Sequence, residues 1–227
     1  MKRDRKMILF MMVFLMAVLF MQTSVSAKRV MRHPSQISIH DLFAETQKDS
    51  PDPNKMSFVF WFPTQTWEAM FHQDPSMSLA DIQEGMAIME DYILVMVLDG
   101  KFGPLGGVTY TSEQDVRYNL RMIDVNGVEH RPLADSEVGA DVRIFANMIK
   151  MIIAENLGSM GDNLNIFFFI SKSVDASSDG DFHIRVGDEL YSWRFPLATL
   201  LETSTCPICG SQWPGNYNFC PWEGTPL

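Results

Sequence analysis

Two short stretches near the end of the chain have similar sequences and limit how that region can fold. CPICG (206–210) and CPWEG (220–224) share the order Cys-Pro-x-x-Gly. The first is a Cys-x2-Cys pair, and the second has Glu223 where a second cysteine would belong. Zn²⁺ in structural sites prefers four tetrahedral ligands, commonly thiolates from two such pairs. The repeat therefore indicates a pair of metal knuckles with a carboxylate in the fourth position.

The residues around the cysteines suit a site of this kind. The proline in each stretch restricts the backbone between the two candidate ligand positions. Gly210 and Gly224 can take a positive φ, which lets backbone amides turn back toward the sulfurs. The residues between the two stretches are enough for a short hairpin with its turn at 214–216. Three aromatic side chains in this segment can cover a metal from one side: Trp213, Tyr217 and Phe219.

Residues 206–227 resemble the short bacterial zinc ribbons that have a CPxCG first knuckle and an FCPxDGTPL second knuckle. Both prolines, both glycines and the final Thr-Pro-Leu agree with that pattern. The resemblance implies that Cys206, Cys209 and Cys220 are zinc ligands. It also implies that Glu223 takes the fourth position, where those ribbons have Asp or Cys, and a carboxylate oxygen can bind Zn²⁺. If Glu223 does not reach the ion, water fills that position.

The first 27 residues have the three parts of an export signal. Four basic residues precede an unbroken apolar run of 15 residues (7–21), and a polar stretch follows that ends at Ala27. This pattern predicts cleavage before Lys28 and an extracytoplasmic location, in the periplasm or secreted. The alternative is an uncleaved membrane anchor, although a spanning helix needs about 20 apolar residues. The whole chain is similar to exported bacterial proteins of unknown function with a zinc-ribbon tail, a resemblance that implies no activity.

The predicted location bears on the redox state of the cysteines. Outside the cytoplasm, cysteines tend to be oxidised. Cys206 and Cys209 could form a disulfide that leaves Cys220 free, whereas bound zinc would keep all three as thiolates. CPIC also resembles a thioredoxin-type dithiol, but that motif opens a helix. The following residues, 210–214, are a poor helix start.

The charge of the chain argues against nucleic acid as a partner. The formal net charge is −10. Without residues 1–27, 14 basic and 27 acidic residues remain, which gives −13. Such a surface repels phosphate backbones and anionic lipid. We expect contact with a membrane only if the N-terminal segment stays uncleaved.

The middle of the chain is rich in predicted strands. Residues 28–55 are polar and end in a turn-rich stretch, which predicts a linker with one short helix at 38–45. Dense aromatic and β-branched residues predict buried strands, and two hairpins are expected, the first with a type I′ turn at Asn126-Gly127. The strands are predicted at 56–62, 92–99 and 163–170, and the hairpins at 117–133 and 181–195. Short strands joined by hairpins predict an α+β fold: an antiparallel, Ig-like β-sandwich with inserted helices over 56–202, followed by the zinc ribbon at 203–227.

One long helix interrupts this strand pattern. Residues 139–157 have helical length and no proline, and Gly158 follows as a C-terminal cap. The segment has a broad apolar face, which is usually buried within a domain. An alternative is that the face forms a homodimer contact.

The region before the ribbon lacks common catalytic motifs. Residues 28–205 contain no zinc-protease His-Glu pattern, no Gly-x-Ser-x-Gly and no cysteine. The sequence therefore favours an exported, non-enzymatic interaction or structural protein with a structural zinc ribbon and an unidentified protein partner. Three alternatives stay open: a zinc-handling periplasmic protein, a zinc-dependent enzyme with Glu223 as base, and a dithiol redox protein.

Overall fold

The computed structural model describes residues 29–227, apart from the side chains of residues 152–157, 159 and 173. The predicted signal peptide, residues 1–27, lies outside the described residues. Within 29–227, no helix is both long enough and apolar enough to cross a membrane. Contacts divide this region into two compact units. The larger unit comprises Arg29–Ser204 and Pro214–Asn216, and the smaller unit comprises Thr205–Trp213 and Tyr217–Leu227.

Helices and antiparallel sheets occur together in the larger unit, which confirms the predicted α+β class. The α-helices are α2 (Ile39–Thr46), α3 (Thr64–Gln73), α4 (Leu79–Met89), α5 (Glu113–Asn119), α6 (Ala140–Leu157) and α7 (Ser159–Asp162). Short 3₁₀ helices are η1 (Pro34–Gln36), η2 (Asp135–Glu137), η3 (Ser171–Ser173) and η4 (Ala198–Leu200). Serine side chains begin several helices; for example, Ser78 and Asp81 form a reciprocal capping box at the start of α4.

Within the described residues, the strands form two four-stranded sheets and two short hairpins. The first sheet has the order β1 (Gln47–Asp49), β2 (Phe58–Phe62), β3 (Tyr92–Leu98) and β8 (Asn165–Ile170). The second has the order β10 (Glu189–Phe195), β9 (Gly180–Val186), β6 (Leu120–Ile123) and β7 (Glu129–His130). The short pairs are β4 (Gly100–Phe102) with β5 (Val108–Tyr110), and β11 (Ser204–Thr205) with β12 (Gln212–Trp213).

The first sheet is buried on both faces. Alternate side chains of β3 enter two different hydrophobic clusters: Ile93, Val95 and Val97 in one, and Leu94, Met96 and Leu98 in the other. Since both faces are covered, the strands have continuous apolar sequences instead of an alternation of apolar and polar residues. The three strands predicted from such sequences are confirmed as β2, β3 and β8.

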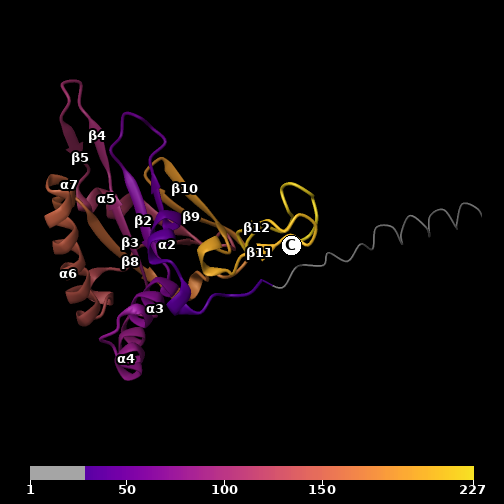
Figure 1. Cartoon of the computed structure of the whole chain (residues 1–227). Helices are drawn as coiled ribbons and strands as arrows, with labels where there is room; N and C mark the ends of the chain where they lie inside the picture. Colours follow the sequence, from indigo (N-terminus) through magenta and orange to yellow (C-terminus); the bar gives the residue numbers. More distant parts are fainter. Residues whose placement is uncertain (1–28) are drawn as a thin grey trace, which may run out of the picture. The chain divides into compact units, whose positions relative to one another are not determined.

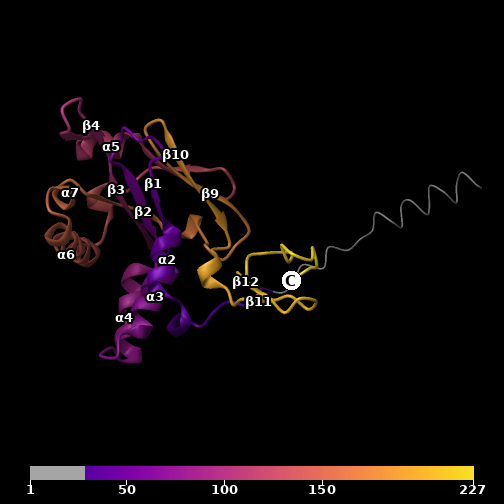
Figure 2. The same ribbon diagram turned by 45° about the horizontal axis from the view of Figure 1, so that its top comes forward.

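Different elements cover the two faces of this sheet. On one face, Trp61 of β2 packs with its ring centroid 4.6 Å from that of Phe182 in β9 and 5.7 Å from that of Phe195 in β10. The other face carries a cluster that includes Trp67 of α3 and Val142 of α6. Figures 1 and 2 show β2 and β3 with α6 on one side and the β9–β10 hairpin on the other.

The interval 28–55 was expected to be a linker, but its described residues, 29–55, contribute ordered structure to the larger unit. Its short helix is confirmed as α2, with the Ser38 side chain as N-cap, and β1 pairs with β2. Glu45 of α2 fixes this segment to a distant part of the chain. Its carboxylate accepts hydrogen bonds from the amides of Ala198 (2.7 Å) and Thr199 (2.9 Å), and its carbonyl accepts one from the Trp193 indole (2.9 Å). These long-range bonds leave no sequence signal.

Replacing Glu45 by alanine is expected to lower the free energy of unfolding by about 1.5–3 kcal/mol, because two amides at the start of η4 lose a charged acceptor. Urea denaturation measures the change. Glu84→Ala is the matched control, since Glu84 is an exposed side chain on α4, and it is expected to change stability by less than about 0.5 kcal/mol. Equal stability of the two variants would contradict this role for Glu45.

The hairpin predicted at 117–133 is shorter than expected, and the prediction that its turn is of type I′ is wrong. Helix α5 occupies the chain up to Asn119, so that only β6 and β7 pair. A type I′ turn needs a positive φ at both central residues. Gly127 has φ 78°, but no described non-glycine residue has a positive φ, and this includes Asn126.

Asp124 explains the different turn. Its carboxylate accepts hydrogen bonds from the amides of Asn126 (2.9 Å) and Val128 (3.0 Å), and it lies 2.9 Å from the His130 ring. Burial acts to raise the pKa of Asp124, but the hydrogen bonds from His130, Val128 and Asn126 lower it overall. The side chain of Asp124 therefore fixes the conformation of this loop, whereas the sequence pattern had indicated that Asn126-Gly127 would do so.

The long helix predicted at 139–157 is confirmed as α6, but only part of its apolar face is buried. Val142 and Ala146 are buried in the cluster under the first sheet. Ile144, Met148 and Met151 are 59%, 48% and 65% exposed. Their spacing of four and three residues places them on one face of the helix. Helix α6 therefore contributes to the core and also presents an apolar stripe.

Candidate metal centre

The first knuckle is a tight turn between β11 and β12. The amide of Cys206 donates to the carbonyl of Ser211 (2.9 Å), and the amide of Gly210 donates back to the carbonyl of Cys206 (3.0 Å). Gly210 has φ 72°, a conformation that favours glycine. This turn places Cys206 and Cys209 at the two ends of one short loop.

The second knuckle repeats the same backbone pattern. The amide of Cys220 donates to the carbonyl of Thr225 (2.8 Å), and the amide of Gly224 donates to the carbonyl of Cys220 (2.8 Å). Gly224 has φ 63°. Glu223 therefore takes the place in this loop that Cys209 takes in the first.

The three cysteines lie together as free thiols. Their sulfur atoms are all within 4.8 Å of one another, and the sulfurs of Cys209 and Cys220 are 3.7 Å apart. Cys206 and Cys220 are buried, whereas Cys209 is exposed. This group could hold a metal ion. Glu223 is exposed and is not part of the group, so its role as fourth ligand stays a prediction.

The pKa values of two thiols move in opposite directions. A hydrogen bond from the Ser211 side chain, helped by the Ser211 amide and by the other two cysteines, lowers the pKa of Cys209 to about 7. The amide of Cys209 acts to lower the pKa of Cys206, but loss of solvent and the neighbouring thiols raise it overall. Three adjacent sulfurs resist full ionisation without a cation, and a bound metal would remove that obstacle.

Aromatic side chains pack beside one another within the smaller unit. Trp213 stacks on Tyr217, with ring centroids 5.9 Å apart and an interplanar angle of 10°. Trp222 also contacts Trp213, with centroids 6.0 Å apart. From the sequence, Trp213 and Tyr217 were expected to cover the metal, but Trp222 was not. Trp222 lies between two candidate ligands in the second knuckle. Phe219, also expected to cover the metal, is 59% exposed.

No protein-family model matches this chain, and no curated protein or solved structure matches it.

Proposed function

We propose that the smaller unit is a zinc ribbon whose ion is structural, and that the protein is an exported, non-enzymatic interaction protein. The observation that carries this proposal is the convergence of three thiols from two loops with the same backbone geometry. Thiolate ligands in pairs of this spacing suit Zn²⁺. Glu223 completes the site because it takes the position in its loop that Cys209 takes in the other.

Burial supports a structural role for the ion. Among the described residues of the smaller unit, the buried side chains are Cys206 and Cys220. A chain segment this short cannot form a sufficient apolar core, and small units of this kind usually depend on a metal or a disulfide. The ion and its ligands would therefore serve as the core.

Exposed apolar side chains support docking to a protein partner. Large hydrophobic residues of the smaller unit are widely exposed: Ile208 at 67%, Tyr217 at 43%, Phe219 at 59% and Trp222 at 74%. Aromatic residues are enriched at protein interfaces, and groups of exposed apolar side chains often mark such sites. The acidic composition disfavours nucleic acid as the partner.

Two further predictions belong to this proposal. The exposed stripe on α6, formed by Ile144, Met148 and Met151, is the surface that a homodimer through this helix would use.

The shared aromatic cluster around Trp61 supports face-to-face packing of the two four-stranded sheets as a sandwich.

A second candidate function is metal handling. Cys209 is exposed, and its pKa of about 7 makes the thiolate accessible near neutral pH. An exposed thiolate ligand can pass a metal to another protein. In this case the zinc would exchange readily instead of staying bound.

The test is the metal content and thiol count of mature protein purified from its own export compartment without added zinc. We expect about one zinc ion per chain, with thiols that react only after chelation or unfolding. A Glu223→Gln variant is expected to bind zinc about tenfold or more weakly, since one ligand is lost. Glu202→Gln is the control, because Glu202 is exposed and lies outside both knuckles.

Two other outcomes would contradict a structural zinc. Protein without metal and with one free thiol would indicate a disulfide between Cys206 and Cys209. Zinc that a weak chelator removes rapidly from the folded protein would support metal handling instead.

A further inference from the structure

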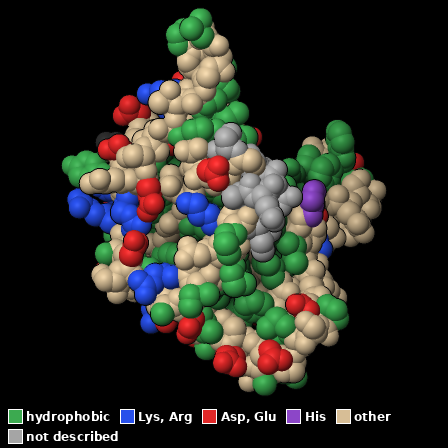
Figure 3. Space-filling model, turned by 90° about the vertical axis from the view of Figure 1, so that its left-hand side faces the viewer, with side chains coloured by type: hydrophobic (Ala, Val, Ile, Leu, Met, Phe, Trp, Pro, Cys, Tyr) green, Lys and Arg blue, Asp and Glu red, His purple; other side chains and the backbone are tan. Residues whose placement is uncertain are grey.

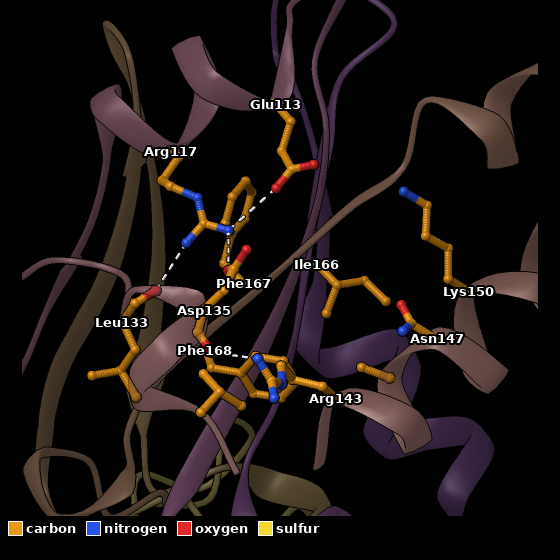
Figure 4. Close-up of a pocket in the computed structure, with 12 residues that line it drawn as sticks. Glu113, Arg117, Leu133, Asp135, Arg143, Asn147, Lys150, Ile166, Phe167 and Phe168 are labelled. Carbon is orange, nitrogen blue, oxygen red and sulfur yellow. Dashed lines mark hydrogen bonds and ion pairs between the residues drawn. The ribbon is translucent and has the colours of Figure 1, made fainter. Parts of the chain in front are cut away.

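The larger unit contains a cavity of about 250 Å³ that no sequence motif indicated. Residues of α5, α6, β8 and the segment 133–138 line it. Figure 4 shows Arg117 with Glu113 and Asp135 on one side, Lys150 and Asn147 on the other, and Ile166 between them. The cavity thus combines charged walls with an apolar floor.

The floor is formed by the edge strand of the first sheet. Ile166, Phe167 and Phe168 of β8 line the cavity, and β8 is the last strand in its sheet. The amide of Leu133 donates to the carbonyl of Phe168 (2.8 Å), which fixes the 133–138 segment as a wall. A ligand placed here would lie against aliphatic and aromatic side chains.

On the wall that carries Arg117, the positive charge is already neutralised by acidic neighbours. Arg117 donates to the carbonyl of Leu133 (2.8 Å) and pairs with Glu113 (3.2 Å) and Asp135 (2.9 Å). Its guanidinium also lies 5.1 Å from the ring centroid of Phe167. These contacts hold Arg117 in place and satisfy its charge, so it shapes the cavity without requiring a ligand.

The wall formed by α6 carries polar side chains with few partners within the protein: Arg143 and Asn147 are exposed, and Lys150 is half-buried. Arg143, Asn147 and Lys150 of α6 are spaced by four and three residues, which places them on one helix face. Arg143 donates to the carbonyl of Asp135 (3.0 Å), but neither it nor Lys150 forms an ion pair with any residue in the described part of the chain. Within the same residues, Asn147 and Lys150 make no hydrogen bond through their side chains.

The charges of the lining favour a singly charged anion. Three basic side chains and two acidic side chains line the cavity, so their formal sum is +1. This contrasts with the net charge of −10 for the whole chain. Figure 3 shows Lys and Arg side chains gathered on the face that carries α6, with acidic side chains among them.

We propose that this cavity binds a small organic monoanion, a carboxylate with a short aromatic or aliphatic body. The carboxylate accepts hydrogen bonds from Lys150, Asn147 and Arg143, and the body lies on Ile166 and Phe168. Charge-assisted hydrogen bonds of this kind are stronger than neutral ones. The site lies in the larger unit and does not depend on the proposed zinc ion.

The test uses 4-fluorobenzoate as the probe and follows its ¹⁹F relaxation as purified full-length protein is added. Neutral 4-fluorobenzamide has nearly the same shape and is expected to bind about tenfold or more weakly. Lys150→Met and Arg143→Gln are each expected to weaken 4-fluorobenzoate binding about tenfold. Arg143 is exposed and Lys150 is half-buried on α6, and neither belongs to the hydrophobic core, so the variants should keep the thermal midpoint of the unaltered protein.

The matched control is Lys101→Met, which removes the same charge from an exposed position of β4 and should leave probe binding unchanged. Three results would overturn the proposal. They are the absence of saturable 4-fluorobenzoate binding at millimolar concentrations, equal binding of the benzamide, and equal loss of binding in Lys101→Met. A zinc-depleted sample should bind the probe normally, which separates this proposal from that of the ribbon.

Discussion

A Cys220→Ser variant is expected to lose its metal and the folded structure of the smaller unit, while the larger unit stays folded. Cys220 is one of the two buried side chains among the described residues of that unit, so the proposed metal site would replace an apolar core. Structural zinc binding supplies about 10–16 kcal/mol to comparable small motifs at neutral pH. A serine hydroxyl does not supply the anionic sulfur that the site needs.

Hydrogen exchange with mass spectrometry separates the two units. Amides in 205–213 and 217–227 should exchange at unfolded rates in Cys220→Ser and in chelator-treated protein, while those of β2, β3 and β8 keep their protection. Ile208→Ser is the control, because Ile208 lies between two candidate ligands in the first knuckle but is 67% exposed. Retained protection of the smaller unit in Cys220→Ser would contradict a structural ion.

Replacing Trp61 by alanine is expected to lower the free energy of unfolding of the larger unit by about 3–5 kcal/mol. Trp61 is fully buried. Its ring centroid lies 4.6 Å from that of Phe182, 5.9 Å from that of Trp193 and 5.7 Å from that of Phe195. The side chain therefore joins β2 of one sheet to β9 and β10 of the other, and its removal leaves a cavity that these neighbours only partly fill.

Urea denaturation monitored by far-UV circular dichroism measures this loss. Trp222→Ala is the matched control, since Trp222 is 74% exposed and its removal is expected to cost less than about 0.5 kcal/mol. A Trp61→Phe variant keeps an aromatic ring in the cluster and should lose less than Trp61→Ala. If Trp61→Ala unfolded at the same urea concentration as the unaltered protein, this would contradict the conclusion that Trp61 joins the two sheets in one core.

Local sequence patterns predicted many individual elements of the larger unit. Continuous apolar runs identified β2, β3 and β8, because strands covered on both faces need apolar side chains at every position. The start of α4 carries a capping box of Ser78 and Asp81, a pattern that is visible in the sequence. Helix α5 was missed, although Ser112 and Asp115 carry the same kind of start signal. The end of α5, residues 117–119, overlaps the hairpin that the sequence predicted at 117–133.

Long-range contacts explain where prediction failed. Residues 28–55 have a linker-like composition, but the Glu45 carboxylate accepts hydrogen bonds from two amides more than 150 residues away in sequence. The turn at Asn126-Gly127 follows the hydrogen bonds of Asp124 and not the preference of Asn-Gly for type I′. In both cases a single carboxylate outweighs the local propensity, and composition does not indicate which carboxylate will do so.

The sequence by itself determined the candidate metal ligands, because the three cysteines lie within a short segment whose prolines and glycines fix the two loops. Only the tertiary structure decided the lining of the anion cavity. Arg117, Arg143 and Lys150 carry no spacing that relates α5 to α6, and their positions depend on how both helices pack against β8. A site built from neighbours in sequence is readable from its spacing, whereas a site built by packing exists only once the chain has folded.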